Sequence, residues 1–286
     1  LGALLRDRGR LTAAEEQYPQ AQHLQNSPLR PTLTLAVIAS PQADIPAARR
    51  HLSEAESFAQ TPMQKSQVRE GNALLEFRLG KVREAIRQTL EQEQYMLKSQ
   101  GLLEVTLSIY VPLIEYYVFL GDFKAAHAAL DTAIGQLTPP ADKFMAFSAA
   151  VIHARENDIV AAEVALEKAR EVMEQFQLAY LGAQVQLVQA IISEAKGDYA
   201  AVAVHTLKTI EQLKQTAVGN SVQFGLPQIY AQIARAHTRL GELDKEEDAI
   251  EDGFQIDPSE PWLWVEKARL QQARDMPQLA LASVNY

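Results

Sequence analysis

One pattern recurs eight times along the sequence: a turn residue with a small side chain at a fixed distance on either side of it. The turn residues, spaced 34 to 44 residues apart, are Gly9, Ala43, Gly80, Gly121, Asn157, Gly197, Gly241 and Asp275. Alanine stands seven residues before six of these turns and five residues after six of them. Helices cross closely only where the facing side chains are small, so the pattern predicts a row of helical hairpins. Ile114, Val202 and Glu246 depart from the pattern, and we expect wider crossings there.

The spacing of apolar residues and the placement of prolines predict an all-α fold. In residues 163–173, Leu166, Ala169 and Met173 recur three and four apart with charges between them, which is typical of an amphipathic helix. No segment alternates apolar and polar residues over a useful length for a strand. Prolines lack an amide donor and therefore mark helix ends. They predict loops at 61–62, 138–140, 217–227 and 257–258. Pro112 falls inside an expected helix and is expected to kink it.

The sequence predicts a single domain over residues 1–286, because in such an array each hairpin contacts only its neighbours. The expected repeats span roughly 1–27, 28–61, 62–100, 101–138, 139–176, 177–218, 219–257 and 258–286. The sequence begins without methionine inside an expected first helix and stops inside an expected second helix. We therefore expect it to be a piece of a longer polypeptide.

The segment around the last two turns carries the most specific motif. It reads Leu240-Gly241-Glu242-Leu243, then Ile256-Asp257-Pro258, then Trp264, with 34 residues from Gly241 to Asp275. This motif resembles the tetratricopeptide repeat family, whose unit is a 34-residue pair of antiparallel helices with a proline near its end. The resemblance implies a right-handed α-α superhelix, a solenoid of about eight helix-turn-helix repeats. Most other units are longer, and in this they are similar to the superhelical domain of MalT-type bacterial transcription activators.

The resemblance also implies a groove lined by the first helix of each hairpin, with groove positions 13, 10, 6 and 3 residues before the turn. The groove residues that we expect to bind a ligand are Val111, Phe144, Phe147, Val151, Leu187, Ile191, Arg235, Arg239, Trp262 and Arg269. We expect a peptide to place apolar side chains near Phe144, Phe147 and Val151 and a carboxylate near Arg235 and Arg269. The alternative is that this register is off by one residue and that these side chains pack between helices.

No catalytic motif is present, so we expect no enzyme, no cofactor and no metal site. The sequence lacks a phosphate-binding loop, a dinucleotide-binding glycine motif, a zinc-protease motif and an EF-hand loop. It has no cysteine, and none of its six histidines has a second histidine three or four positions away. The net charge of −9 repels phosphate backbones, so direct nucleic-acid binding is not expected. No apolar run is long enough for a membrane span.

These observations favour a non-catalytic scaffold or regulatory module that binds a protein or peptide, part of a larger bacterial signalling protein. One alternative is the sensor arm of a MalT-like regulator, which binds a small molecule and controls oligomerisation; a homo-oligomer stays open. Another is an enzyme fragment whose repeats only hold a catalytic domain. The loop 217–227 is either a spacer or a gate over the groove. We expect the cytoplasm as the location, with the periplasm left open.

Overall fold

The computed structural model describes residues 29–39, 44–96, 103–176, 181–215, 222–258 and 260–284. These residues form fourteen α-helices and one 3-10 helix, and none of them lies in a strand. This confirms the all-α prediction. The expected first repeat, with Gly9, lies outside the described residues, and so does Ala43.

The chain divides into two compact units, and each is a series of helical hairpins. Unit 1 ends at Ile152 and unit 2 begins at His153, inside one helix. The helices of unit 1 are α4 (Leu29–Ala39), α5 (Ile45–Phe58), α6 (Pro62–Arg78), α7 (Val82–Met96), α8 (Leu103–Phe119), α9 (Phe123–Gln136) and η1 (Ala141–Met145), followed by α10 (Ala146–Arg155), which crosses the boundary. The helices of unit 2 are α11 (Ile159–Gln175), α12 (Gly182–Ala195), α13 (Tyr199–Gln215), α14 (Val222–Leu240), α15 (Leu243–Ile256), α16 (Pro261–Ala273) and α17 (Pro277–Val284). The prediction of a single array of eight repeats stays a prediction.

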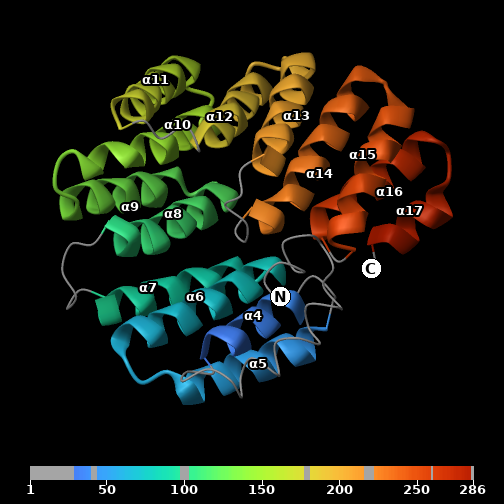
Figure 1. Cartoon of the computed structure of the whole chain (residues 1–286). Coiled ribbons are helices and arrows are strands. Elements are labelled where there is room, and N and C mark those ends of the chain that lie inside the picture. The colour runs from blue at the N-terminus through green and yellow to red at the C-terminus, as the bar shows by residue number, and fades with distance from the viewer. Residues whose placement is uncertain are drawn as a thin grey trace. The chain divides into compact units, whose positions relative to one another are not determined.

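Consecutive helices pair into the expected hairpins (Figure 1). In unit 1 the pairs are α4 with α5, α6 with α7 and α8 with α9; in unit 2 they include α12 with α13, α14 with α15 and α16 with α17. The first helix of one hairpin also packs on the first helix of the next, as α4 does on α6 and α14 on α16. Neighbouring hairpins therefore pack against each other within each unit, and their buried side chains form several hydrophobic clusters.

The predicted turn residues are the positions where the backbone enters the left-handed region. Six of the eight lie in the described chain, and all six have positive φ: Gly80 (71°), Gly121 (70°), Asn157 (65°), Gly197 (74°), Gly241 (74°) and Asp275 (59°). A residue in this conformation ends a helix, and the next amide donates back to a carbonyl of the last turn. At Gly121, for example, the Asp122 amide donates to the Tyr117 carbonyl at 2.9 Å. The predicted turns are confirmed at these six positions.

An aspartate directly after the turn often starts the second helix. The side chains of Asp122, Asp158 and Asp198 each accept a hydrogen bond from the amide three residues on, at 3.0 to 3.1 Å. Such an N-cap satisfies one of the amides that have no partner inside a helix. The two-residue sequence of turn residue plus aspartate therefore ends one helix and begins the next.

The predicted crossing positions are buried where the two helices of a hairpin meet. The buried alanines at these positions are Ala36, Ala48, Ala73, Ala85, Ala126, Ala150, Ala162, Ala190, Ala234 and Ala268. The three departures from the pattern, Ile114, Val202 and Glu246, are also buried, with at most 2% of their surface exposed. A carboxylate thus occupies a core position between α14 and α15.

One expectation about loops is wrong. Helix α14 begins at Val222 and continues through Pro227, so residues 222–227 are not part of the expected loop 217–227. Near the start of a long helix, proline costs one backbone hydrogen bond, and Leu226 and Pro227 are buried there. Pro112 lies inside α8, as expected. Among the described helices, none combines the length and the apolar character that crossing a bilayer requires.

Candidate functional site

The expected groove residues of unit 1 differ in how much of their surface a ligand can reach. Val111 of α8 is 40% exposed, whereas Phe147 of α10 is buried. Phe144 of η1 and Val151 of α10 are half-buried. The exposed part of this set is therefore Val111, with Phe144 and Val151 partly accessible. Phe147 packs in the interior, as the alternative reading of the sequence expected for such side chains.

The apolar groove residues of unit 2 lie at the edge of its core. Ile191 of α12 is buried, and Leu187 of the same helix is half-buried. Leu187 and Trp262 both pack against the cluster that α13 to α16 form around Leu263. The second tryptophan, Trp264, packs on Phe254 of α15 with ring centroids 4.8 Å apart. Binding by the predicted groove residues stays a prediction.

A chain of ion pairs links the first helices of successive hairpins in unit 2. Arg155 of α10 donates from Nη1 to Glu194 Oε2 at 2.9 Å, and Arg235 Nη1 of α14 donates to Glu194 Oε1 at 3.4 Å. Arg235 Nε also donates to Glu266 Oε1 of α16, at 3.0 Å. Arg269 Nη1 contacts both oxygens of Glu266, at 2.8 and 2.9 Å. We call these five residues the ion-pair chain.

The carboxylates of the ion-pair chain are more buried than its arginines. The side chain of Glu266 is fully buried and that of Glu194 is 16% exposed. The side chains of Arg155, Arg235 and Arg269 are 39%, 31% and 50% exposed. A buried carboxylate is costly unless several donors surround it, and the two arginines on Glu266 supply them. The arginine side chains therefore form the solvent side of this surface.

Arg239, the third arginine of the predicted set, makes a different contact. Its guanidinium carbon lies 5.8 Å from the ring centroid of Tyr199, on the neighbouring helix α13. A cation over an aromatic face is attracted by the ring quadrupole. The structure thus brings together Arg235 and Arg269, adds Arg155 from outside the predicted set, and places Arg239 on Tyr199.

Glu266 and Arg155 could not be identified from the groove positions, whereas Glu194 stands three residues before Gly197, at one of those positions. Arg155 lies two residues before its turn, outside the four groove positions, and Glu194 lies 39 residues further along the chain. One signal was available: Glu266 precedes Arg269 by three residues, a spacing at which side chains on a helix meet. The contacts between helices depend on packing, which sequence spacing does not fix.

Glu246, at the crossing of α14 and α15, is a buried carboxyl group with no hydrogen-bond partner among the described residues. The nearby Thr238 hydroxyl donates to the Ala234 carbonyl at 3.0 Å. Burial raises the pKa of Glu246, and the charge of Glu266 raises it further. The charges of Arg274 and Arg269 lower the pKa, but burial is the largest effect.

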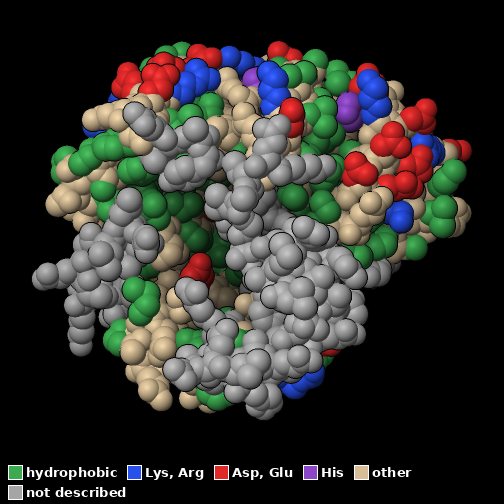
Figure 2. Space-filling model, viewed as in Figure 1, with side chains coloured by type: hydrophobic (Ala, Val, Ile, Leu, Met, Phe, Trp, Pro, Cys, Tyr) green, Lys and Arg blue, Asp and Glu red, His purple; other side chains and the backbone are tan. Residues whose placement is uncertain are grey.

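Acidic side chains dominate the outer surface of α15. Asp244, Asp248, Glu251 and Asp252 are all exposed. Figure 2 shows Asp and Glu side chains gathered over this helix and its neighbour α16. Such a surface repels phosphate backbones.

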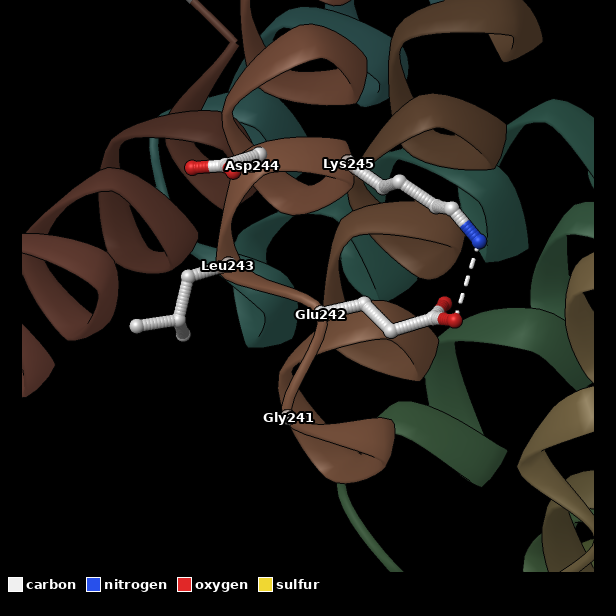
Figure 3. A pocket seen from close by; sticks show the side chains of 5 residues that line it. All are labelled: Gly241, Glu242, Leu243, Asp244 and Lys245. Atoms are coloured by element: carbon white, nitrogen blue, oxygen red, sulfur yellow. Dashed lines mark hydrogen bonds and ion pairs between the residues drawn. The ribbon is translucent and has the colours of Figure 1, made fainter.

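A shallow pocket of about 420 Å³ lies at the turn between α14 and α15 (Figure 3). Its lining residues are the five consecutive residues Gly241 to Lys245. Lys245 Nζ donates to Glu242 Oε1 at 2.9 Å, and the other oxygen of Glu242 lies 2.7 Å from His237 Nδ1. These bonds, first that of Lys245, lower the pKa of Glu242. Within the described part of the chain one turn supplies this lining, so no polar groups from neighbouring hairpins converge on the pocket there.

Comparisons with known proteins agree with this architecture. The family model described as tetratricopeptide repeat matches residues 227–270, which run from α14 into α16. No curated protein sequence matches the chain. Among solved structures, the chain is similar to a Rap protein complexed with competence and sporulation factor, at 14% sequence identity and a TM-score of 0.62. The match covers 99% of this chain and 82% of the Rap chain.

Two further structures are similar over nearly the whole chain. Cut9, from the APC/C hetero-tetramer Cut9-Hcn1, matches at 14% identity and a TM-score of 0.53, covering 98% of this chain and 49% of that one. Yeast Tom70 matches at 15% identity and a TM-score of 0.50, covering 96% and 53%. The chain thus spans about half the length of these two proteins. The similarity to MalT-type activators is not confirmed. The chain has the fold of the tetratricopeptide repeat proteins, and its segment 227–270 matches that family's model.

Proposed function

We propose that this chain is a non-catalytic scaffold that binds a protein or a peptide along the first helices of its hairpins. The observation that carries the proposal is the solvent side of the ion-pair chain, where arginine side chains of α10, α14 and α16, 31% to 50% exposed, pair with the less exposed carboxylates of Glu194 and Glu266. A Rap protein of similar fold is complexed with competence and sporulation factor, which supports a binding role for this fold.

The chemistry of this surface suits binding and not reaction. Arginine stays protonated in proteins, so it holds an anion without transferring a proton. Its planar group makes two parallel hydrogen bonds to a carboxylate, which fixes the orientation of a ligand. The neighbouring half-buried Leu187 and Trp262 offer apolar surface in the same unit.

The finer proposal concerns the ligand and its setting. In unit 2, a carboxylate of a ligand binds at Arg235 and Arg269. In unit 1, taken by itself, Val111, Phe144 and Val151 offer apolar side chains that a ligand contacts. The chain serves as the regulatory module of a larger bacterial signalling protein and works in the cytoplasm. The acidic surface of α15 supports a protein or peptide partner over a nucleic acid.

The experiment compares binding by the unaltered chain and by the double variant Arg235→Gln, Arg269→Gln. Partners retained on the immobilised chain are identified and then titrated by calorimetry. We expect the double variant to bind at least about tenfold more weakly, because each charge-assisted hydrogen bond contributes about 1.5 to 3 kcal/mol.

The control is the double variant Arg87→Gln, Arg170→Gln, which removes the same charge from the second helices α7 and α11. Circular dichroism verifies that each variant keeps its helices. Equal affinity of the Arg235, Arg269 variant and the unaltered chain contradicts the anion site on the first helices.

A further inference from the structure

The three arginines of the ion-pair chain lie side by side on three first helices. Arg155 and Arg235 contact the two oxygens of one carboxylate, that of Glu194. Arg235 and Arg269 contact the same oxygen, Oε1 of Glu266. Because each neighbouring pair shares a carboxylate, the guanidinium groups follow one another across α10, α14 and α16.

Each of these guanidinium groups retains donors for a ligand. A guanidinium carries five N–H donors on Nε, Nη1 and Nη2. Arg155 and Arg269 use only Nη1, while Arg235 uses Nε and Nη1, within the described part of the chain. Nη2 of all three arginines, and Nε of Arg155 and Arg269, therefore have no hydrogen-bond acceptor among the described residues, and these side chains are 31% to 50% exposed. The glutamates hold the arginine side chains in place, so less side-chain conformational entropy is lost when a ligand binds.

We propose that this row of three arginines binds a peptide segment with two or more acidic side chains. The inference rests on the proposed function and names the ligand class of that surface. Within the ion-pair chain, three guanidinium groups and two carboxylates leave an excess of one positive charge. The row is also longer than one carboxylate, so it has room for two or more acidic side chains.

The charge of unit 2 favours a short acidic peptide over a polyanion. Residues 153–286 carry 12 Lys and Arg against 20 Asp and Glu, a net charge of −8. At long range this charge repels a nucleic acid, whose phosphates extend far beyond the row. A short acidic peptide contacts only the row, so it is repelled less by the rest of unit 2 than a nucleic acid is. It also gains the hydrogen bonds to the three arginines.

The test selects ligands without assuming one. A library of random dodecapeptides, displayed without a free carboxyl terminus, is selected on the immobilised full chain, and the strongest binder is then synthesised and titrated. We expect enrichment of Asp and Glu in the selected peptides. Arg155→Gln should weaken binding of the synthetic peptide about tenfold, whereas the control Arg170→Gln on α11 should change it less than about twofold.

A second arm replaces each acidic residue of the peptide by its amide. If an acidic side chain contacts Arg155, its replacement weakens binding to the unaltered chain and has little effect on binding to the Arg155→Gln variant. Peptides without acidic enrichment, or equal binding by the Arg155→Gln variant, overturn this inference and leave the proposed function standing. Selection of no peptide overturns the inference as well, whereas the proposed function is contradicted only by equal affinity of the Arg235, Arg269 variant and the unaltered chain.

Discussion

At Gly253 of α15, a single methyl group would collide with the core. A Cβ atom there would lie 2.7 Å from both δ-carbons of Leu263 and 3.1 Å from Tyr230 Cβ. Leu263 is fully buried, so its side chain can move aside only if its close-packed core neighbours shift with it. Overpacking costs about 1 to 3 kcal/mol, against a gain in helix propensity of about 1 kcal/mol. We expect Gly253→Ala to lower the thermal midpoint of unfolding.

The matched control for Gly253 is Gly135→Ala in α9, where the added Cβ meets nothing within 4 Å. There only the backbone effect remains, and we expect a stabilisation of about 0.5 kcal/mol. A Gly253→Ala chain as stable as the Gly135→Ala chain would contradict the close approach of α15 to α14 and α16.

Glu246 is expected to make stability depend on pH. Its pKa is raised above the ordinary value of 4.5 in the folded chain, chiefly by burial. The unfolded chain therefore loses this proton at lower pH than the folded chain, and the folded state loses stability as the pH rises above 4.5. The amide in Glu246→Gln cannot ionise, so this variant should unfold at a higher temperature than the unaltered chain at pH 8, and at a similar temperature near pH 4. An equal shift at both pH values would contradict the ionisation effect.

At the scale of the element, the aspartates that follow the turns set where second helices begin. Asp198 accepts from the Ala201 amide at 3.0 Å and caps α13. Asp198→Ala leaves that amide without its side-chain partner, and we expect a loss of about 1 kcal/mol in unfolding free energy. Asp198→Asn keeps a hydrogen-bond acceptor at the same place, so its loss of unfolding free energy should be much smaller. If alanine and asparagine give the same thermal midpoint, the cap does not stabilise the helix.

The elements also show which parts of the structure local sequence determines. Gly197 and Asp275 were predictable as turns because the left-handed conformation is a property of the residue and its immediate neighbours. The start of α14 was not, because burial of Leu226 and Pro227 outweighs the bond that proline removes. Arg235 was predicted as a groove residue, but its bond to Glu266 joins residues 31 apart and depends on how α14 packs on α16.

At the scale of the whole molecule, the fold repeats one local structure, a helical hairpin with a left-handed turn and small residues where its helices cross. The same turn and the same buried small residues recur in both units, which is why the sequence predicted the architecture from Ala36 to Ala268. The candidate site has a different origin. Its charges differ from repeat to repeat, so no single repeat predicts the ion-pair chain, and only the packed helices of unit 2 bring Arg155, Glu194 and Arg235 together.

Removal of the last hairpin should weaken the chain without abolishing its structure. The main packing partners of α16 are α14, α15 and α17, so a chain that ends at Asp257 loses contacts only at its terminal repeat. Stability in such arrays is a sum over repeats and the interfaces between neighbours. We expect the truncated chain to keep nearly the same helicity per residue by circular dichroism and to unfold at a lower temperature. In the truncated chain Arg235 keeps Glu194 as its carboxylate partner. Ile250 and Tyr230 lose the packing of Leu263 in their hydrophobic cluster. Loss of helicity throughout the truncated chain would show that the repeats depend on contacts beyond their neighbours.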